Sequence, residues 1–371
     1  MASFSLYDKN TTFSGVYVVF MVNRMQTLYL LLIMPSYLVH PYMIWVILTL
    51  GILSQLNLLL LSKWFSSNAA SRGYQGFVQL FGERTLRFFA FLGLFIILIK
   101  IIVLTLGIGT VVHQYIYPSM NSNWFILFIF LICYYIAAQG LEKTVSFVVI
   151  AFLSTTWMLI AFYPFFLPPT ASLHNLYPLI PTEGSFIPWK QLLFVWSALS
   201  GPEFLVFLTP WLKPQQNMLK YMTMANAFTV VEYAILFIAA LLFFGSTYLS
   251  KTRFPLVDMI GYLQFPLFER MDKMLISIHL FILVFVISIF ILYFYGAVRI
   301  VLGTSDKQTT RFGFTTCWLV ILASSVITNE WLWKSGEEQS LWLNLEVWSR
   351  AVTYLFVPAL LLALTKLKEK F

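Results

Sequence analysis

Four ionisable residues lie inside long apolar stretches of this sequence: Arg24, Lys100, Glu203 and Glu232. At the centre of a bilayer each such group costs at least about 2.5–3.5 kcal/mol, so it is a functional candidate by default. Two of the four are basic and two are acidic. They predict either a binding site with an ion or proton pathway through Lys100 and Glu232, or buried ion pairs that orient the bundle, such as Lys100 with Glu232 and Arg24 with Glu203.

The strongest local signal is the run Ser200, Gly201, Pro202 and Glu203 within an apolar segment. Pro202 removes a backbone donor and clashes with the preceding helical turn, and Gly201 relaxes the backbone beside it. Backbone groups left unpaired at membrane depth are tolerated where they line a cavity or bind a ligand. We therefore predict that these four residues bind substrate, and a plain proline kink is the alternative.

The first apolar stretch carries its own polar interruption over residues 23–27, which begins with Asn23, Arg24 and Met25 and contains neither Gly nor Pro. Interruptions at corresponding positions of two helices are typical of a midplane site in inverted-repeat transporters. The pattern predicts that these three residues share one substrate site with segment 200–203. The sequence has no metal-ligand cluster, nucleophile–base set or phosphate-binding loop, so we expect no catalytic residue, no metal, no cofactor and no enzyme.

The composition explains where these residues must lie. Of 371 residues, 60% are hydrophobic and 10% are charged, whereas a soluble domain has roughly 45–50% apolar and about 25% charged residues. This excludes a soluble enzyme, a disordered chain and, with two cysteines, a disulfide-stapled domain. The net charge of +8 has no basic cluster interleaved with aromatics, so nucleic acid is not an expected partner. We predict an all-α polytopic membrane protein.

Ten apolar stretches are long enough to approach the roughly 20 residues that span a bilayer. They form one membrane domain over residues 1–371, and ten helices fit two inverted halves of five. The predicted spans are 13–34, 42–61, 88–112, 124–138, 145–166, 191–209, 222–244, 274–295, 314–328 and 348–364.

The distribution of Lys and Arg predicts the orientation of these spans. With the N-terminus inside, the inner segments hold about twice as many Lys and Arg as the outer ones, so both termini are expected to be cytoplasmic. The outer loop between the seventh and eighth spans is an exception to this distribution, because it holds four positive residues, Lys251, Arg253, Arg270 and Lys273. In its segment 254–273, Glu269, Arg270 and Asp272 surround apolar side chains, which predicts an amphipathic stretch along the outer membrane surface.

The same segment resembles the spore germination permeases, the GerAB-type B subunits of nutrient germinant receptors. The resemblance is carried by the run Glu269-Arg270-x-Asp272 and by the apolar residues 254–260 before it. The Asn-Leu-Tyr-Pro of 175–178 and the Ser-Gly-Pro-Glu of 200–203 support it, and length and span number fit over essentially the whole chain.

This resemblance implies a fold similar to that of the amino acid–polyamine–organocation transporters, a LeuT-like 5+5 inverted repeat with broken helices 1 and 6. It implies location in the spore inner membrane, assembly with A and C subunits, and binding of a small nutrient, an amino acid or a sugar, that triggers germination. Two alternatives remain open: a stand-alone amino acid transporter coupled to protons or sodium, and a structural subunit whose buried charges lock the bundle.

Overall fold

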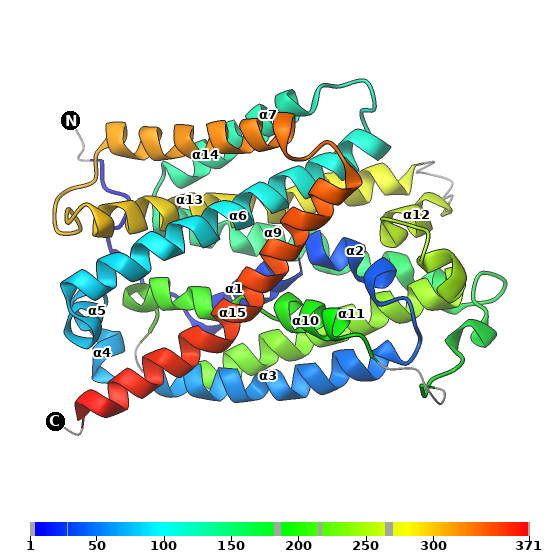
Figure 1. The fold of residues 1–371 in the computed structure, drawn as a ribbon, viewed down its shortest axis with the longest axis horizontal. Helices are drawn as coiled ribbons and strands as arrows, with labels where there is room; N and C mark the ends of the chain where they lie inside the picture. Colours follow the sequence, from blue (N-terminus) through cyan, green and yellow to red (C-terminus); the bar gives the residue numbers. More distant parts are fainter. Residues whose placement is uncertain (1–3, 28, 182–186, 214–216, 264–269, 370–371) are drawn as a thin grey trace.

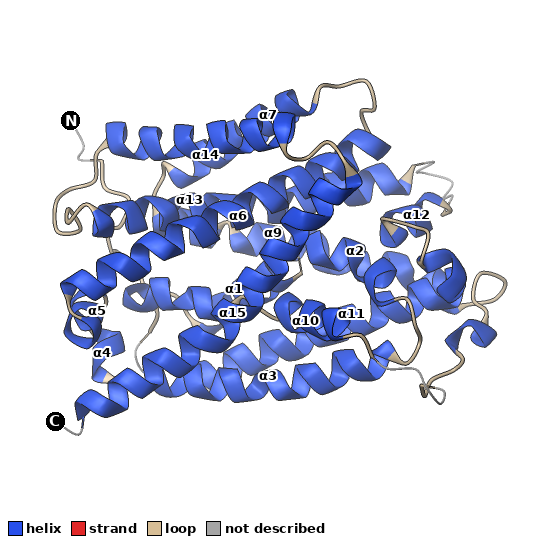
Figure 2. Cartoon of the chain, viewed as in Figure 1, coloured by secondary structure: helices blue, strands red, loops and turns tan. Residues whose placement is uncertain are grey.

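The computed structural model is a bundle of packed helices (Figures 1 and 2). The structure describes residues 4–27, 29–181, 187–213, 217–263 and 270–369. Over these ranges the extended backbone is limited to one isolated parallel bridge between Phe13 and Leu212. The predicted all-α class is therefore confirmed.

The helices divide naturally at the long loop after residue 166. The first part contains α1 (Gly15–Gln26), α2 (Tyr29–Leu38), α3 (Met43–Phe65), α4 (Asn68–Ser71), α5 (Tyr74–Phe81), α6 (Glu83–Tyr115), α7 (Ser122–Ala137), α8 (Leu141–Ser146), α9 (Val148–Thr156) and the 3-10 helix η1 (Trp157–Phe166). The second part contains η2 (Leu173–Leu176), α10 (Trp189–Ala198), η3 (Pro202–Trp211), α11 (Met218–Leu249), α12 (Pro255–Gly261), α13 (Met271–Val301), α14 (Arg311–Trp331) and α15 (Gly336–Glu369).

Eight helical segments of the described chain are long and apolar enough to cross a membrane. The pair α1 and α2 would make a ninth if its two helices, bent by 50°, form one span, and α7 is a shorter apolar helix. The protein is thus a multi-pass membrane protein, while the count of ten spans stays a prediction.

The last long helix differs most from its predicted limits. We predicted a span over 348–364, whereas α15 begins at Gly336. The apolar run is interrupted by charged residues, but the helix continues through them because its backbone hydrogen bonds do not depend on side-chain polarity. Glu346 and Arg350 consequently lie inside a helix, and both are buried.

Two helices stop in the middle of the bundle. Helix α10 ends at Ala198 and η3 begins at Pro202, as expected where a proline lacks the N–H that continues a helix. The interruption predicted over residues 23–27 coincides with the end of α1: Asn23, Arg24 and Met25 form its last turn, and the helix ends at Gln26.

Helix α15 runs diagonally across the molecule in Figure 1, where both ends of the described chain lie at the same end of the long axis. It packs on α3, α10 and α6, and α13 packs on α6, α7 and α9. The inner face of α15 therefore packs against α10.

The 254–273 segment is divided between two helices. Most side chains of α12 are buried, and Met271 and Asp272 open α13, where Asp272 accepts hydrogen bonds of 3.0 and 2.7 Å from Arg270. Glu269 lies outside the described residues. In the described part of the segment, tertiary packing buries α12 and Asp272, and the amphipathic stretch around Glu269 stays a prediction.

Candidate functional site

The C-terminal ends of α1 and α10 meet inside the bundle. The Gln26 side-chain amide donates to the Leu199 carbonyl at 2.6 Å. A Cβ added to Gly201 would lie 3.3 Å from Met25 Cβ and 3.4 Å from the Val22 carbonyl oxygen. The absence of a side chain at position 201 therefore allows the α10–η3 linker, residues 199–201, to approach α1 closely.

Side chains from two other helices cap the carbonyls at these ends. The Tyr233 hydroxyl of α11 donates to the Gln26 carbonyl at 2.6 Å. The Arg350 guanidinium of α15 donates to the Ser197 and Ser200 carbonyls at 2.9 and 3.0 Å, and more weakly to the Met25 carbonyl at 3.4 Å. Carbonyls that the helix itself cannot satisfy thus find partners in the interior.

Glu203 folds back on the linker that precedes it. Its carboxylate accepts a hydrogen bond from the Gly201 N–H at 2.8 Å and another from the Ser200 hydroxyl. It lies in the first turn of η3, where a negative charge is favourable. The predicted residues Ser200, Gly201, Pro202 and Glu203 are therefore brought together and buried.

A first group of charges, which we call the α11 network, consists of Asn23, Arg24, Thr155, Thr229 and Glu232. Arg24 pairs with Glu232 at 2.8 Å and donates to Thr155 at 2.7 Å and, through Nε, to Asn23 at 2.8 Å. The Asn23 amide donates to Glu232 at 2.6 Å and to Thr229 at 2.9 Å. These donors and acceptors satisfy one another, as a buried ion pair requires.

A second group, which we call the α15 cluster, consists of Lys100, Glu346 and Arg350. Glu346 Oε1 lies 3.8 Å from Lys100 Nζ and 3.4 Å from Arg350 Nη1, and all three side chains are at most 2% exposed. Lys100 Nζ also faces the rings of Phe204 and Phe290, 4.8 and 5.4 Å from their centroids.

Two polar atoms of the α15 cluster have no hydrogen-bond partner within the described part of the chain. They are Lys100 Nζ and Glu346 Oε2, and both are buried. Buried polar groups are normally satisfied, so this ammonium and this carboxylate oxygen are exceptions within the bundle.

The pairings considered from the sequence are not those found. Arg24 pairs with Glu232 rather than Glu203, and Lys100 pairs with Glu346 rather than Glu232. Sequence reasoning missed Glu346, which precedes the predicted span 348–364, and Arg350, which lies at the start of that span. Their four-residue spacing, with apolar Val347 and Ala351 between and beside them, was the signal that both lie on one helical face.

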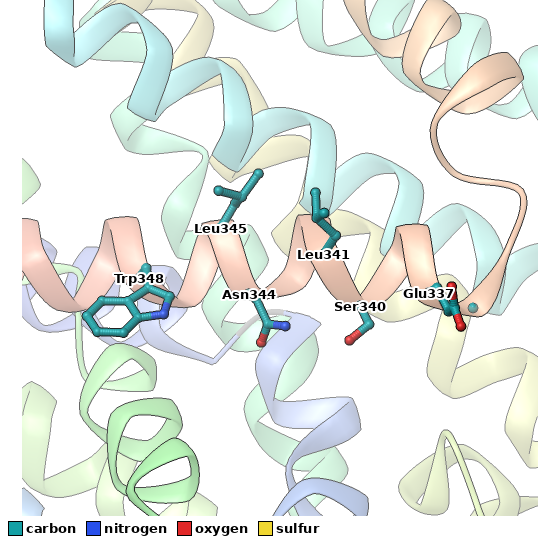
Figure 3. A pocket seen from close by; sticks show the side chains of 7 residues that line it. Glu337, Ser340, Leu341, Asn344, Leu345 and Trp348 are labelled. Atoms are coloured by element: carbon teal, nitrogen blue, oxygen red, sulfur yellow. The ribbon is translucent and has the colours of Figure 1, made fainter.

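Two pockets lie away from the predicted residues. One, of about 500 Å³, follows the exposed side of α15 (Figure 3), where Leu341 and Leu345 point one way and Ser340 and Asn344 another. The other, of about 570 Å³, is formed where the end of α6 meets the α14–α15 turn. No group of three or more His, Cys, Asp or Glu in the described ranges is placed to hold a metal ion.

The sequence has relatives among germination proteins. Residues 18–331 match the family described as "Spore germination protein". The spore germination protein GerQB of Bacillus cereus is 31% identical over 174 residues. That alignment covers 46% of this chain and 47% of GerQB, so it spans about half of each protein.

The fold is that of known transporters. MHP1, a nucleobase-cation-symport-1 family transporter solved in a closed conformation with bromovinylhydantoin bound, aligns with 93% of this chain and 77% of its own, with a TM-score of 0.58 and 15% identity. A manganese transporter of Eremococcus coleocola aligns with 92% of this chain and 76% of its own, with a TM-score of 0.55 and 14% identity. Identities this low show the fold alone; family and fold together point to a permease rather than an enzyme.

Proposed function

The chain belongs to the spore germination protein family, and from that premise we propose that it is the transporter-like membrane subunit of a spore nutrient germinant receptor. A small nutrient, an amino acid or a sugar, binds at mid-membrane and shifts a conformational equilibrium that triggers germination. The proposal is carried by one observation: among the described residues, Lys100 Nζ and Glu346 Oε2 are buried without a hydrogen-bond partner, and Lys100 lies beside Phe204 of the interrupted α10–η3 segment.

The fold that we propose has ten spans in two inverted repeats of five, with the first and sixth spans broken. The bent pair α1–α2 would be the first span, and α10–η3 the sixth. With α7 counted, the helices that are apolar enough reach ten. In support of this arrangement, α1 and α10, the first halves of the two interrupted spans, meet at their C-terminal ends. Discontinuous helices of such transporters likewise form their ligand sites where they are interrupted.

The nutrient site that we propose lies between the end of α1, the α10–η3 linker, α6 and α15. Residues 23–25 and 200–203 form its backbone frame, and Lys100 supplies hydrogen-bond donors. An amino acid carboxylate or sugar hydroxyl would accept from Lys100, and an ammonium or hydroxyl would donate to Glu346 Oε2. Arg24 and Glu232 would hold α1 against α11 so that this frame keeps its shape.

Location and partners follow from the same proposal. The protein would lie in the spore inner membrane with both termini cytoplasmic and assemble with A and C subunits. The excess of Lys and Arg in the inner segments supports this orientation, as does the position of both chain ends at one end of the molecule (Figure 1). Arg270, which is exposed and pairs with the buried Asp272, would then lie at the outer surface, where a partner subunit can reach it.

Germination of spores that carry this receptor alone, tested with a panel of amino acids and sugars, examines the function directly. We expect one class of nutrient to trigger germination, and Lys100→Met to abolish the response while the protein still accumulates. The control is Lys190→Met, which removes an exposed lysine. Normal germination of the Lys100→Met spores would contradict the site.

A second function, a stand-alone amino acid transporter coupled to protons or sodium, is favoured by the transporter folds of the structural neighbours. Uptake of a labelled amino acid by proteoliposomes containing only this chain separates the two. The receptor proposal expects no concentrative uptake, whereas accumulation against a gradient would establish the transporter.

A further inference from the structure

The ends of interrupted helices attract positive charge. Each helix carries roughly half a negative charge at its C-terminus, and here the ends of α1 and α10 lie together. In transporters with discontinuous helices, unwound carbonyls and half-helix C-terminal ends coordinate a mobile sodium ion or proton. The carbonyls of Met25, Ser197 and Ser200 are such a set.

In this protein one side chain already holds that set. Arg350 is 2% exposed, and its guanidinium donates to Ser197 and Ser200 at 2.9 and 3.0 Å, with a weaker contact to Met25 at 3.4 Å. Glu346, one turn earlier on α15, keeps the guanidinium in place from the other side at 3.4 Å.

We propose that Arg350 is a tethered cation, which takes the place at the two helix ends that a mobile coupling cation takes in other transporters of this fold. A sodium ion does not fit there, because its carbonyl ligands are engaged and the guanidinium would repel it. The cation therefore cannot leave, and movement of α15 replaces the binding and release of an ion.

The surrounding formal charges agree with this assignment. Lys100 and Arg350 are balanced by Glu203 and Glu346, and Arg24 is balanced by Glu232. Within the described part of the chain, each carboxylate near the linker is therefore balanced by a positive side chain, and none is left for a further cation. A free ion would add a charge that these residues leave unopposed.

The test is the thermal stability of the whole chain in lipid nanodiscs, compared in sodium chloride and in choline chloride at equal ionic strength. We expect the wild-type unfolding temperature to agree within about 1 °C in the two salts. Stabilisation of the wild type by sodium over choline would overturn the proposal, because a mobile ion would then have a site. This arm needs no variant and no nutrient, so it is independent of the proposed function.

The double variant Arg350→Ala Glu346→Gln extends the test by emptying the carbonyl site without leaving a net charge. We expect it to be less stable and to gain at least about 2 °C in sodium relative to choline, because a small cation can now bind the carbonyls. The matched control is Arg24→Ala Glu232→Gln, which removes an ion pair that does not hold helix-end carbonyls and should show no such gain. Equal responses to sodium in the two double variants would refute the assignment.

If the first double variant does not fold, Arg350→Lys, which keeps the charge, should fold, and its unfolding temperature should be the same in sodium and in choline. Stabilisation of this variant by sodium would contradict the proposal.

Discussion

The two buried charge groups of this protein, one joining α1 to α11 and α9 and the other joining α6 to α15, differ in what they bind. In the α11 network, side chains bind side chains at 2.6–2.9 Å and satisfy one another. In the α15 cluster, Arg350 binds backbone carbonyls, the carboxylate contacts are 3.4 and 3.8 Å, and two polar atoms have no hydrogen-bond partner within the described residues.

This difference indicates two roles. We call the α11 network the lock, because it fixes one arrangement of the helices, and the α15 cluster the switch, because it can change partners. A closed network has a single low-energy arrangement, because any movement breaks several hydrogen bonds in a low dielectric. A loosely paired cluster can exchange partners at lower cost and can accept those of a ligand. We therefore propose that the α11 network serves stability and that the α15 cluster serves the response of the protein.

The largest effect on stability is expected from the lock. Arg24→Met should lower the free energy of unfolding by about 3–5 kcal/mol, because it leaves Glu232 buried without its ion partner. Adding Glu232→Gln to it should recover part of the loss. Unfolding of the single and double variants in detergent gives the coupling energy, which we expect to exceed about 1 kcal/mol; additive losses would mean that the pair is not the centre of the network.

A smaller effect is expected where the two groups meet. Gly201→Ala should cost about 1–3 kcal/mol, because its Cβ would lie within 3.2–3.4 Å of three atoms of α1. The matched control is Gly93→Ala on α6, where an added Cβ meets no atom within 4 Å. Thermal unfolding of both variants measures the contrast, and equal stabilities would show that α1 does not pack against the linker as described.

The switch should tolerate substitution better than the lock. Lys100→Met removes one of the two positive charges that balance Glu203 and Glu346, but the ammonium gives up no hydrogen bond and Glu346 keeps Arg350, so the cost in free energy of unfolding should be about 1–2 kcal/mol, below that of Arg24→Met. The Met side chain packs on Phe204 and Phe290. The same unfolding measurement applies. A loss of stability as large as that of Arg24→Met would show that Lys100 serves to stabilise the fold, as the α11 network does.

The smallest effect is expected from an exposed ion pair whose charged atoms are no farther apart than those of the buried ion pairs. Arg87 and Glu83 are 2.5 Å apart with side chains 42% and 56% exposed. Glu83→Gln should cost only about 0.2–0.5 kcal/mol, because solvent screens the pair. A cost approaching that of Arg24→Met would show that distance, and not burial, governs these ion pairs.

The sequence was informative wherever a residue contrasts with its surroundings. Arg24, Lys100, Glu203 and Glu232 stand out against apolar neighbours, and Pro202 has a fixed effect on a helix, so the α10 break was predictable. Glu346 and Arg350 stand among other polar residues of the 334–350 segment, which hides them.

The pairing of these charges was not predictable from spacing. Arg24 and Glu232 are 208 residues apart, and which helices bring them together depends on the packing of the whole bundle. The interruption predicted over residues 23–27 contains the end of α1 at Gln26. A local reading does not show that Asn23 and Arg24 stay helical with their side chains bound to partners on α11 and α9.

The assignment of switch and lock is tested most directly by nutrient affinity. Binding of the nutrient identified by the germination panel should be measured on purified wild type, on Lys100→Met and on Arg24→Met Glu232→Gln. We predict that Lys100→Met weakens binding at least about tenfold, a loss of about 1.4 kcal/mol, while the double variant, once folded, binds within about threefold of wild type. Unchanged affinity in Lys100→Met together with lost binding in the double variant would contradict the account.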